Sequence, residues 1–185
     1  MVDERSHERT LAPSPFPGDD GVADPAARRA LAAAVRDGGT TAYLRAVAAL
    51  CATRVLVPVV ATATRTATVG SGPGAGLSSD KEADMAVVML QAADGRRALL
   101  GFTGLDALTA WNADARPVPV TLDLAAKTAR SEGVDTVLID VAGPHPLAID
   151  GEVLDGLAQG HRLVEVTEAE FGWAVPDPGT STSEE

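Results

Sequence analysis

The sequence predicts a single α+β domain with one mixed, mostly antiparallel β-sheet and helices packed on it. Two apolar runs, 84–90 and 96–102, flank Asp94-Gly95, a dipeptide that strongly favours a tight turn between antiparallel strands. The other apolar runs alternate with stretches of helical periodicity, so some strands are joined by hairpins and others by helices. This mixture favours one mixed sheet over a doubly wound parallel sheet. A chain of 185 residues suits one domain whose core needs no disulfide or metal support.

The domain is expected over residues 24–175. Residues 1–23 combine charges with Pro and Gly, so we expect a disordered or loosely attached N-terminal arm. Residues 176–185 predict a polar tail. Within the domain, residues 62–79 are Gly-rich and of low complexity, which predicts a long flexible loop.

Two helices are predicted at the start of the domain. Asp24 is expected to cap the first, which begins at Pro25 and ends at the Gly38-Gly39 pair. Thr40 or Thr41 is expected to cap the second. The apolar face of the second helix, at helical spacing, consists of Leu44, Val47, Ala48 and Cys51.

A buried strand and the hairpin follow. The run 54–61 is continuous and β-branched, which predicts a strand buried on both faces. Pro58 within it predicts a bulge, or a side of the strand without a ladder partner. The hairpin 84–102 is the clearest unit of the sequence.

Helices and strands are expected to alternate after the hairpin. The segment from Thr103 to Asp106 resembles a capping box that opens a short helix ending at Trp111. The elements expected next are an extended segment at 116–120, a helix at 122–131, strands at 136–141 and 147–149, a helix at 152–158 and a last strand at 163–166.

The acidic composition limits the partners of the chain. Fifteen Lys and Arg against 26 Asp and Glu give a net charge of −11. Such a surface repels phosphate backbones and anionic lipids, so direct binding of nucleic acid or membrane is disfavoured. The polar N-terminus has no apolar signal core, and no run approaches the roughly 20 apolar residues of a membrane span. A cytoplasmic location is therefore expected.

Several segments together resemble a known family. They read DKEADMAVVMLQAADGRRALLGFT at 80–103, WNADARPVPVTLDLAA at 111–126, DTVLIDVAGPHPLAI at 135–149 and LAQG at 157–160. As a set they are similar to the actinobacterial SseB-family proteins and their SseB N-terminal-type domain, over about residues 27–160. The resemblance implies an α+β domain, and the family name is a label rather than a reaction.

The same name is attached elsewhere to a rhodanese-type sulfurtransferase, whose reaction needs a reactive Cys in a C-x-x-x-x-R loop. Here Leu56 stands five residues after Cys51, where that loop has Arg. Cys51 also falls on the apolar face of a predicted helix, where burial raises a thiol pKa. This position favours a core residue over a nucleophile.

An acidic cluster is the first candidate site. If the chain is extended, Asp80, Glu82 and Asp84 point to one face of the strand entry. Carboxylate oxygens arranged in this way suit Mg²⁺ or Ca²⁺. They equally suit a partner-binding surface, or a solvated loop in which they pair with basic side chains such as Lys81.

Three further residues are candidates. Arg116 can form two parallel hydrogen bonds with a carboxylate of a ligand or partner, or pair with an acidic neighbour. Trp111 is either a rim aromatic of an interface or part of the core. His145 has Asp140 and Asp150 near it in sequence, as an acid–base pair requires, but no nucleophile or second ligand accompanies it.

The sequence therefore predicts a non-enzymatic protein-binding or scaffold module without a cofactor or metal. Its partner is expected to be a protein or a second copy of the chain. The alternative is a small-molecule or divalent-metal site, and with it an enzyme. That alternative site would be built from Asp80, Glu82, Asp84 and Arg116.

Overall fold

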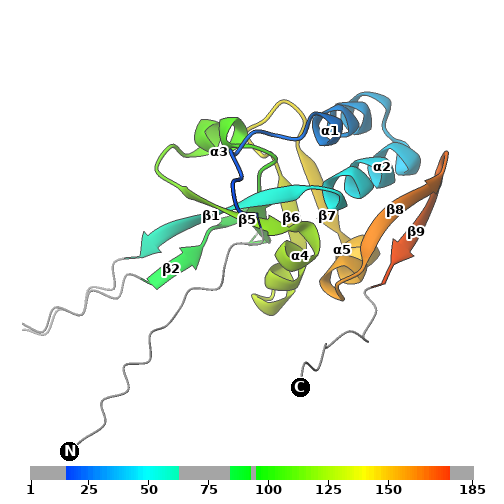
Figure 1. Ribbon diagram of the computed structural model, residues 1–185. Helices are drawn as coiled ribbons and strands as arrows, with labels where there is room; N and C mark the ends of the chain where they lie inside the picture. Colours follow the sequence, from blue (N-terminus) through cyan, green and yellow to red (C-terminus); the bar gives the residue numbers. More distant parts are fainter. Residues whose placement is uncertain (1–15, 63–83, 93–94, 176–185) are drawn as a thin grey trace, which may run out of the picture.

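The computed structural model describes residues 16–62, 84–92 and 95–175, which confirm the expected α+β class (Figure 1). The helices are α1 (Pro25–Asp37), α2 (Gly39–Cys51), α3 (Leu105–Trp111), α4 (Leu122–Ser131) and α5 (Gly151–Ala158). The strands are β1 (Arg54–Thr62), β2 (Asp84–Val87), β3 (Met89–Gln91), β4 (Arg97–Gly101), β5 (Arg116–Thr121), β6 (Thr136–Ile139), β7 (Leu147–Asp150), β8 (Arg162–Thr167) and β9 (Glu170–Ala174).

Seven of these strands form two sheets that are joined to each other. Their orders are β2-β1-β5 and β3-β4-β6-β7. β2 and β3 follow one another and are separated only by Val88, whose N–H donates to the Pro58 carbonyl at 3.2 Å. Leu56 and Phe102 also exchange backbone hydrogen bonds of 2.8 and 2.9 Å between the sheets. Only the β4–β6 pair is parallel, so the joined sheets match the mixed, mostly antiparallel sheet that the sequence predicts.

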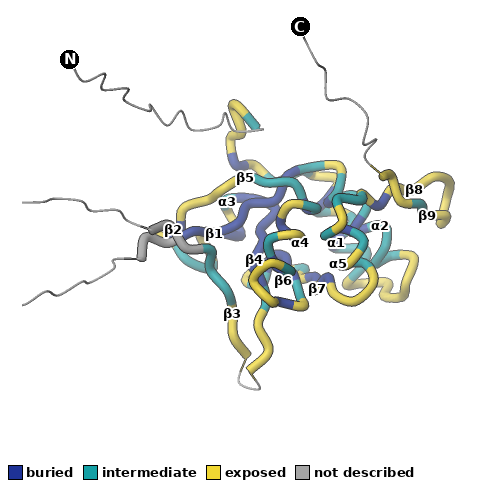
Figure 2. The backbone as a smooth tube through the Cα atoms, turned by 90° about the horizontal axis from the view of Figure 1, so that it is seen from below, coloured by how far each residue is buried: buried dark blue, intermediate teal, exposed yellow. Residues whose placement is uncertain are grey.

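The central strands of the sheet are buried on both faces. On one face, α1, α2, α4 and α5 pack against alternate strand residues such as Val55, Val57 and Leu99. On the other face, α3 packs against the residues between them, such as Leu56 and Leu100. This alternation follows from the two-residue period of a strand and produces two apolar layers. In Figure 2 the buried stretches of the backbone gather in the middle of the domain.

The hairpin predicted over 84–102 is confirmed for β3 and β4, whereas Asp84–Val87 (β2) pairs with β1 instead of continuing the first strand of the hairpin. Met89, Leu90 and Gln91 pair with Leu99, Ala98 and Arg97 in antiparallel register. The turn is closed by a hydrogen bond of 2.8 Å from Ala92 N–H to the Arg96 carbonyl, and Gly95 has a φ of 85° that favours glycine.

Prolines occupy the outer edge of β5. The backbone N–H and C=O of Leu56 form hydrogen bonds with Phe102, and the Pro58 carbonyl accepts a hydrogen bond from Val88. Their partners across the β1–β5 ladder, Pro119 and Pro117, therefore direct their backbone groups away from β1, to the open side of β5. Neither has an N–H to donate there, so this edge cannot add a further strand in regular register.

The start of α1 agrees with the sequence, whereas that of α2 does not. The Asp24 carboxylate accepts from the N–H groups of Ala26 and Ala27, both at 2.8 Å. The prediction of a Thr cap for α2 is wrong, because that helix begins at Gly39 with Gly38 before it and without a side-chain cap. Both glycines have positive φ values, 65° and 78°, so the chain reverses between the helices before either threonine.

The capping box predicted before α3 is also wrong. Gly104 is the N-cap residue and no side chain caps the helix. The Thr103 hydroxyl instead donates to Asp140 Oδ2 at 2.6 Å, and Asp106 accepts from Arg28 Nη2 at 2.7 Å. Both side chains are used by partners distant in sequence.

The C-terminal hairpin β8–β9 is a separate two-stranded sheet. The sequence predicts only its first strand, since the turn between the strands contains Glu168 and Ala169 rather than Gly, Asn or Pro. Ala169 adopts a φ of 64° there. Leu163 of β8 is buried and packs on the main core, which docks the hairpin on the domain.

The described end of the expected N-terminal arm, residues 16–23, lies against the domain. The Gly21 carbonyl accepts from Leu105 N–H at 2.8 Å, and Asp19 pairs with Arg54. Residues 1–15, the loop at 63–83 and the expected tail at 176–185 lie outside the described residues. Among the helices of the described part, none is long and apolar enough to cross a membrane.

Candidate functional site

The expected acidic cluster is only partly described. Asp80 and Glu82 lie outside the described residues, and Asp84 begins β2 opposite Thr62. Arg116 begins β5 opposite Val59, on the other side of β1. Two strand spacings and three residues along β1 separate the backbone positions 84 and 116, which corresponds to about 14 Å. The small-molecule or metal site built from these residues stays a prediction.

Trp111 and Arg116 differ in their surroundings. The Trp111 ring is half-buried and lies 5.6 Å from the Phe102 ring, centroid to centroid, in the apolar layer below α3. Arg116 is exposed, and none of the other described residues forms an ion pair with it. Trp111 therefore contributes to packing, whereas Arg116 remains at the surface.

His145 is half-buried in the turn before β7, and its Nδ1 has no hydrogen-bond partner among the described residues. Asp140 is bonded to Thr103 instead. Asp150 lies five residues further along an extended strand, at about 3.3 Å per residue. Neither carboxylate is bonded to His145.

A polar cluster that the sequence did not predict, buried at Thr103 and Asp140, joins α1 and α3 to the ends of β4 and β6. Asp140 is 1% exposed and accepts from the Thr103 N–H at 2.8 Å and from the Thr103 hydroxyl at 2.6 Å. Arg28 approaches from α1, with Nε 3.5 Å from Asp140 Oδ2 and Nη2 2.7 Å from Asp106 Oδ1. The hydrogen bond from Arg28 holds the pKa of Asp106 below its ordinary value.

A second cluster adjoins it through Thr103. Arg54, 6% exposed, donates to the two carboxylate oxygens of Asp19 at 2.8 and 2.9 Å. It also donates to the carbonyls of Thr103 and Val22, at 2.5 and 2.9 Å. The hydrogen bonds from Arg54 lower the pKa of Asp19, although partial burial opposes the shift. The Asp19–Arg54 pair holds the segment before α1 against β1. In both clusters the carboxylates and guanidinium groups pair with each other within the chain.

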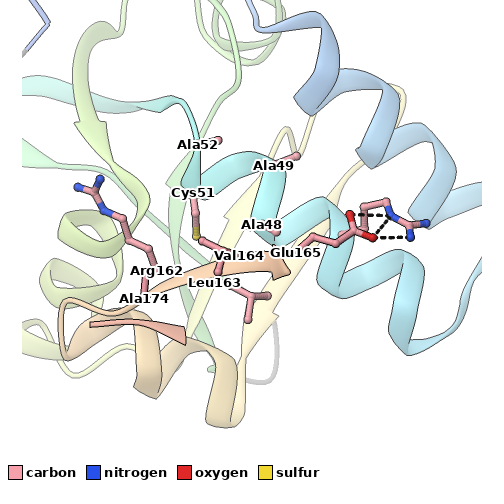
Figure 3. Close-up of a pocket in the computed structure, with 10 residues that line it drawn as sticks. Ala48, Ala49, Cys51, Ala52, Arg162, Leu163, Val164, Glu165 and Ala174 are labelled. Atoms are coloured by element: carbon pink, nitrogen blue, oxygen red, sulfur yellow. Dashed lines mark hydrogen bonds and ion pairs between the residues drawn. The ribbon is translucent and has the colours of Figure 1, made fainter. Parts of the chain in front are cut away.

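The cavity between α2 and β8, about 480 Å³, is lined mainly by apolar side chains (Figure 3). Ala48, Cys51 and Ala52 line it from α2, and Val164 lies on the opposite wall. The Arg45–Glu165 ion pair of 2.6 Å closes one end. Burial raises the pKa of Cys51 to about 11, and a backbone hydrogen bond from Leu163 opposes this shift. The thiol is thus protonated at neutral pH, as expected of a packing residue.

Cys51 should consequently react slowly with iodoacetamide in the folded chain. With its pKa at about 11, the thiolate fraction at pH 8 is about 0.1%, against roughly a quarter for an ordinary thiol of pKa 8.5. We expect alkylation at pH 8, followed by mass spectrometry, to be at least about 200-fold slower than in the same chain unfolded in urea. The folded rate should rise about tenfold per pH unit toward pH 10. Equal rates in the folded and unfolded chain would show that Cys51 is a reactive, accessible thiol.

Exposed apolar side chains are concentrated on the β8–β9 hairpin. Four of the nine exposed large apolar residues of the described part lie on it or directly after it: Val164 (40%), Val166 (63%), Trp173 (40%) and Val175 (64%). The Trp173 ring lies against α5, where a Cβ on Gly156 would come within 2.9 Å of the indole. β8 faces α2, and no strand among the described residues pairs with the outer edge of β9 (Figure 1).

The comparisons with known proteins identify the family of this domain. The SseB protein N-terminal domain family matches residues 28–155. No curated protein and no solved structure matches the chain. The matched region runs from α1 into α5, so it contains the joined sheets and the cluster around Asp140, while Asp19 of the second cluster precedes it and the β8–β9 hairpin follows it. Because the match covers well over half of the chain, the protein belongs to the SseB family.

Proposed function

We propose that this SseB-family chain is a non-enzymatic, cytoplasmic protein-binding module whose interface is the β8–β9 hairpin. The observation that carries the proposal is the outer edge of β9, with which no described strand pairs, beside exposed Val166, Trp173 and Val175. An open edge presents a row of backbone donors and acceptors to which a strand of another chain can bond. Exposed apolar side chains beside that edge supply area that a partner can bury.

Two of the other sheet edges, those of β5 and β7, are less suited to binding a strand. Pro117 and Pro119 remove the donors from the outer edge of β5, near which Arg116 lies. β7 has four residues and continues directly into α5. β9 contains no Pro and no Lys, the residues that commonly protect an exposed edge. This contrast is the reason for placing the interface at the hairpin rather than near Trp111 and Arg116.

The non-enzymatic part of the proposal is supported by the state of the titratable groups. A nucleophile or general base needs a free lone pair within reach of a substrate. Asp140 is instead bonded to Thr103 within the core, and Cys51 is held protonated by burial. Arg28 and Arg54 are likewise engaged with carboxylates of the same chain.

Site-specific photocrosslinking tests the proposal. A photoreactive amino acid would replace Val166 or Val175 in one set of variants, and Val35 of α1 in the matched control, in cells that make the chain at its natural level. Val35 is also an exposed apolar residue, at 52%. We expect a discrete crosslinked protein from both hairpin positions and none from position 35. Equal labelling at all three positions, or no adduct from the hairpin, would contradict the proposal.

A further inference from the structure

We infer that the partner of the β9 edge is a second copy of this chain, paired antiparallel with the first about a two-fold axis at Gly172. The inference rests on the proposed function, because it assigns the occupant of the same surface. It predicts a continuous four-stranded sheet across the dimer, in the order β8, β9, β9 and β8.

The backbone of β9 has the pattern that such pairing requires. Thr167 and Glu170 pair with each other across the two-residue turn of the hairpin, and a pair in that position is hydrogen-bonded. Because the backbone groups alternate along β9, those of Gly172 also face β8, whereas Trp173 directs its N–H and C=O to the open edge. Phe171, two residues earlier on the same strand, does the same. In an antiparallel ladder these are the groups that a second strand bonds.

The sequence of β9 is nearly symmetric about its central glycine. It reads Glu-Phe-Gly-Trp-Ala from Glu170 to Ala174. A two-fold axis at Gly172 places Phe171 opposite Trp173 of the second copy, and the symmetry repeats this pair on the other side. Both residues lie on the hairpin face that packs toward α5, so the axis creates two cross-strand aromatic contacts. Gly172 lies on the axis and has no side chain that would clash with Gly172 of the second copy.

Charges on the opposite face of the hairpin are also complementary under this axis. Arg162 is paired with Ala174 across the β8–β9 ladder. The axis places Glu170 of the second copy on the far side of Ala174, in the same row. Two strand spacings, about 9.6 Å, then separate the Cα atoms of the Arg and the Glu, with only a methyl group between them. An Arg and a Glu side chain together span that distance. Arg162 also pairs with Asp123 Oδ1 at 3.3 Å, so Glu170 of the second copy would share the guanidinium with that carboxylate.

The interface is small, so the dimer should be weak. Pairing of two five-residue strands buries less than the roughly 1,200 Å² of a standard protein interface. The net charge of −11 on each copy opposes association at low ionic strength. We therefore expect a concentration-dependent dimer with a dissociation constant in the micromolar range, tighter at moderate salt than at low salt.

Charge variants at the axis test both the partner and the register. The experiment is sedimentation velocity of the full chain over a wide range of concentrations. In Gly172→Lys the new ammonium groups of the two copies oppose each other at the axis, and in Gly172→Glu two carboxylates do, so each variant should dimerise at least about tenfold more weakly than the wild type. An equimolar mixture of the two variants should recover the dimer, because Lys then opposes Glu. Gly172→Ala is the matched control and should dimerise like the wild type.

The controls separate loss of pairing from loss of folding. A Cβ at position 172 would lie 3.2 Å from Val166 Cγ2, so each variant is checked by near-ultraviolet circular dichroism, which reports the packing of Trp173 on α5. If any variant unfolds the hairpin, disulfide trapping of an Ala174→Cys, Glu170→Cys variant in the Cys51→Ala background replaces it, since the axis pairs position 174 with position 170 of the second copy.

The outcomes of this test also distinguish the inference from the proposed function. A wild-type chain that stays monomeric at every concentration overturns the inference, and so does a mixture of the Lys and Glu variants that fails to associate. If position 175 then still crosslinks to a different protein, the hairpin remains a protein-binding surface with another partner. If the hairpin crosslinks to nothing, both the inference and the proposed function fail.

Discussion

Replacing Arg54 with Ala is expected to lower the free energy of unfolding by about 3 kcal/mol, the lower end of the range seen when one partner of a buried ion pair is removed. Arg54 is 6% exposed, whereas solvent reaches Asp19, which reduces the penalty for leaving its carboxylate unpaired. The substitution leaves the Asp19 carboxylate without its charge partner, and the carbonyls of Thr103 and Val22 without their donor. The penalty arises mainly from these unsatisfied groups rather than from the pair itself.

The measurement is urea denaturation followed by Trp fluorescence, together with hydrogen exchange of residues 16–24. We expect faster exchange in that segment, because Arg54 holds it to β1. The matched control is the double variant Arg54→Met, Asp19→Leu, which removes both charges and should recover a large part of the loss. A loss below about 1 kcal/mol in Arg54→Ala, with unchanged exchange, would show that the segment is held by other contacts.

The same pair gives stability a defined dependence on pH. The pKa of Asp19 lies below 3.8 in the folded chain, because Arg54 donates hydrogen bonds to its charged form. A depressed pKa means that the contribution of Asp19 is fully present above the unfolded value and is lost as the pH falls through the folded value. The wild type should therefore lose more stability than Arg54→Ala when both are acidified below about pH 4.

Replacing Asp140 with Ala should cost about 3 kcal/mol, because it leaves the buried N–H of Thr103 without an acceptor. The Thr103 hydroxyl and the Arg28 guanidinium lose the same partner. The backbone adds to the loss, since Asp140 has a φ of 49°, a conformation that Asp and Asn adopt more readily than Ala. Chemical denaturation of the two variants Asp140→Ala and Asp140→Asn measures the effect.

Asp140→Asn is the informative control. Its side-chain carbonyl can still accept from the Thr103 N–H, and Asn also tolerates the left-handed backbone, so it should lose less stability than the Ala variant. If Asn and Ala are equally destabilised, the negative charge facing Arg28 matters more than the hydrogen bond to the backbone.

The elements that the sequence predicted correctly are those that depend on contacts between residues close together in the chain. Asp24 caps α1 because its carboxylate reaches N–H groups two and three residues away, and the hairpin around Gly95 is likewise a short-range structure. The segment from Thr103 to Asp106 has the residues of a capping box, yet both side chains bond to partners distant in sequence. Residues that resemble a local motif are available for tertiary contacts too, and the sequence alone does not say which use prevails.

The candidate surface could be predicted only in part, for a similar reason. The buried state of Cys51 follows from its place on an apolar helical face. The Asp19–Arg54 pair joins residues 35 positions apart, a separation at which no spacing rule applies. β9 was missed because its turn has no turn-forming residue, and with it the open edge and the exposed side of Trp173.

The central position of β1 also has a consequence for synthesis. β1 leaves the ribosome early, yet one of its neighbours, β5, ends 59 residues later, at Thr121. At about 5–20 residues per second, a β-branched segment waits about 3–12 s for that neighbour. Such a run is prone to pair with other nascent chains, and a proline within it is a common safeguard. Pro58, in the middle of the Arg54–Thr62 run, interrupts it at a position where the finished sheet requires no donor toward β5. The residue that fits the folded ladder is thus also the one that protects the chain before the ladder exists.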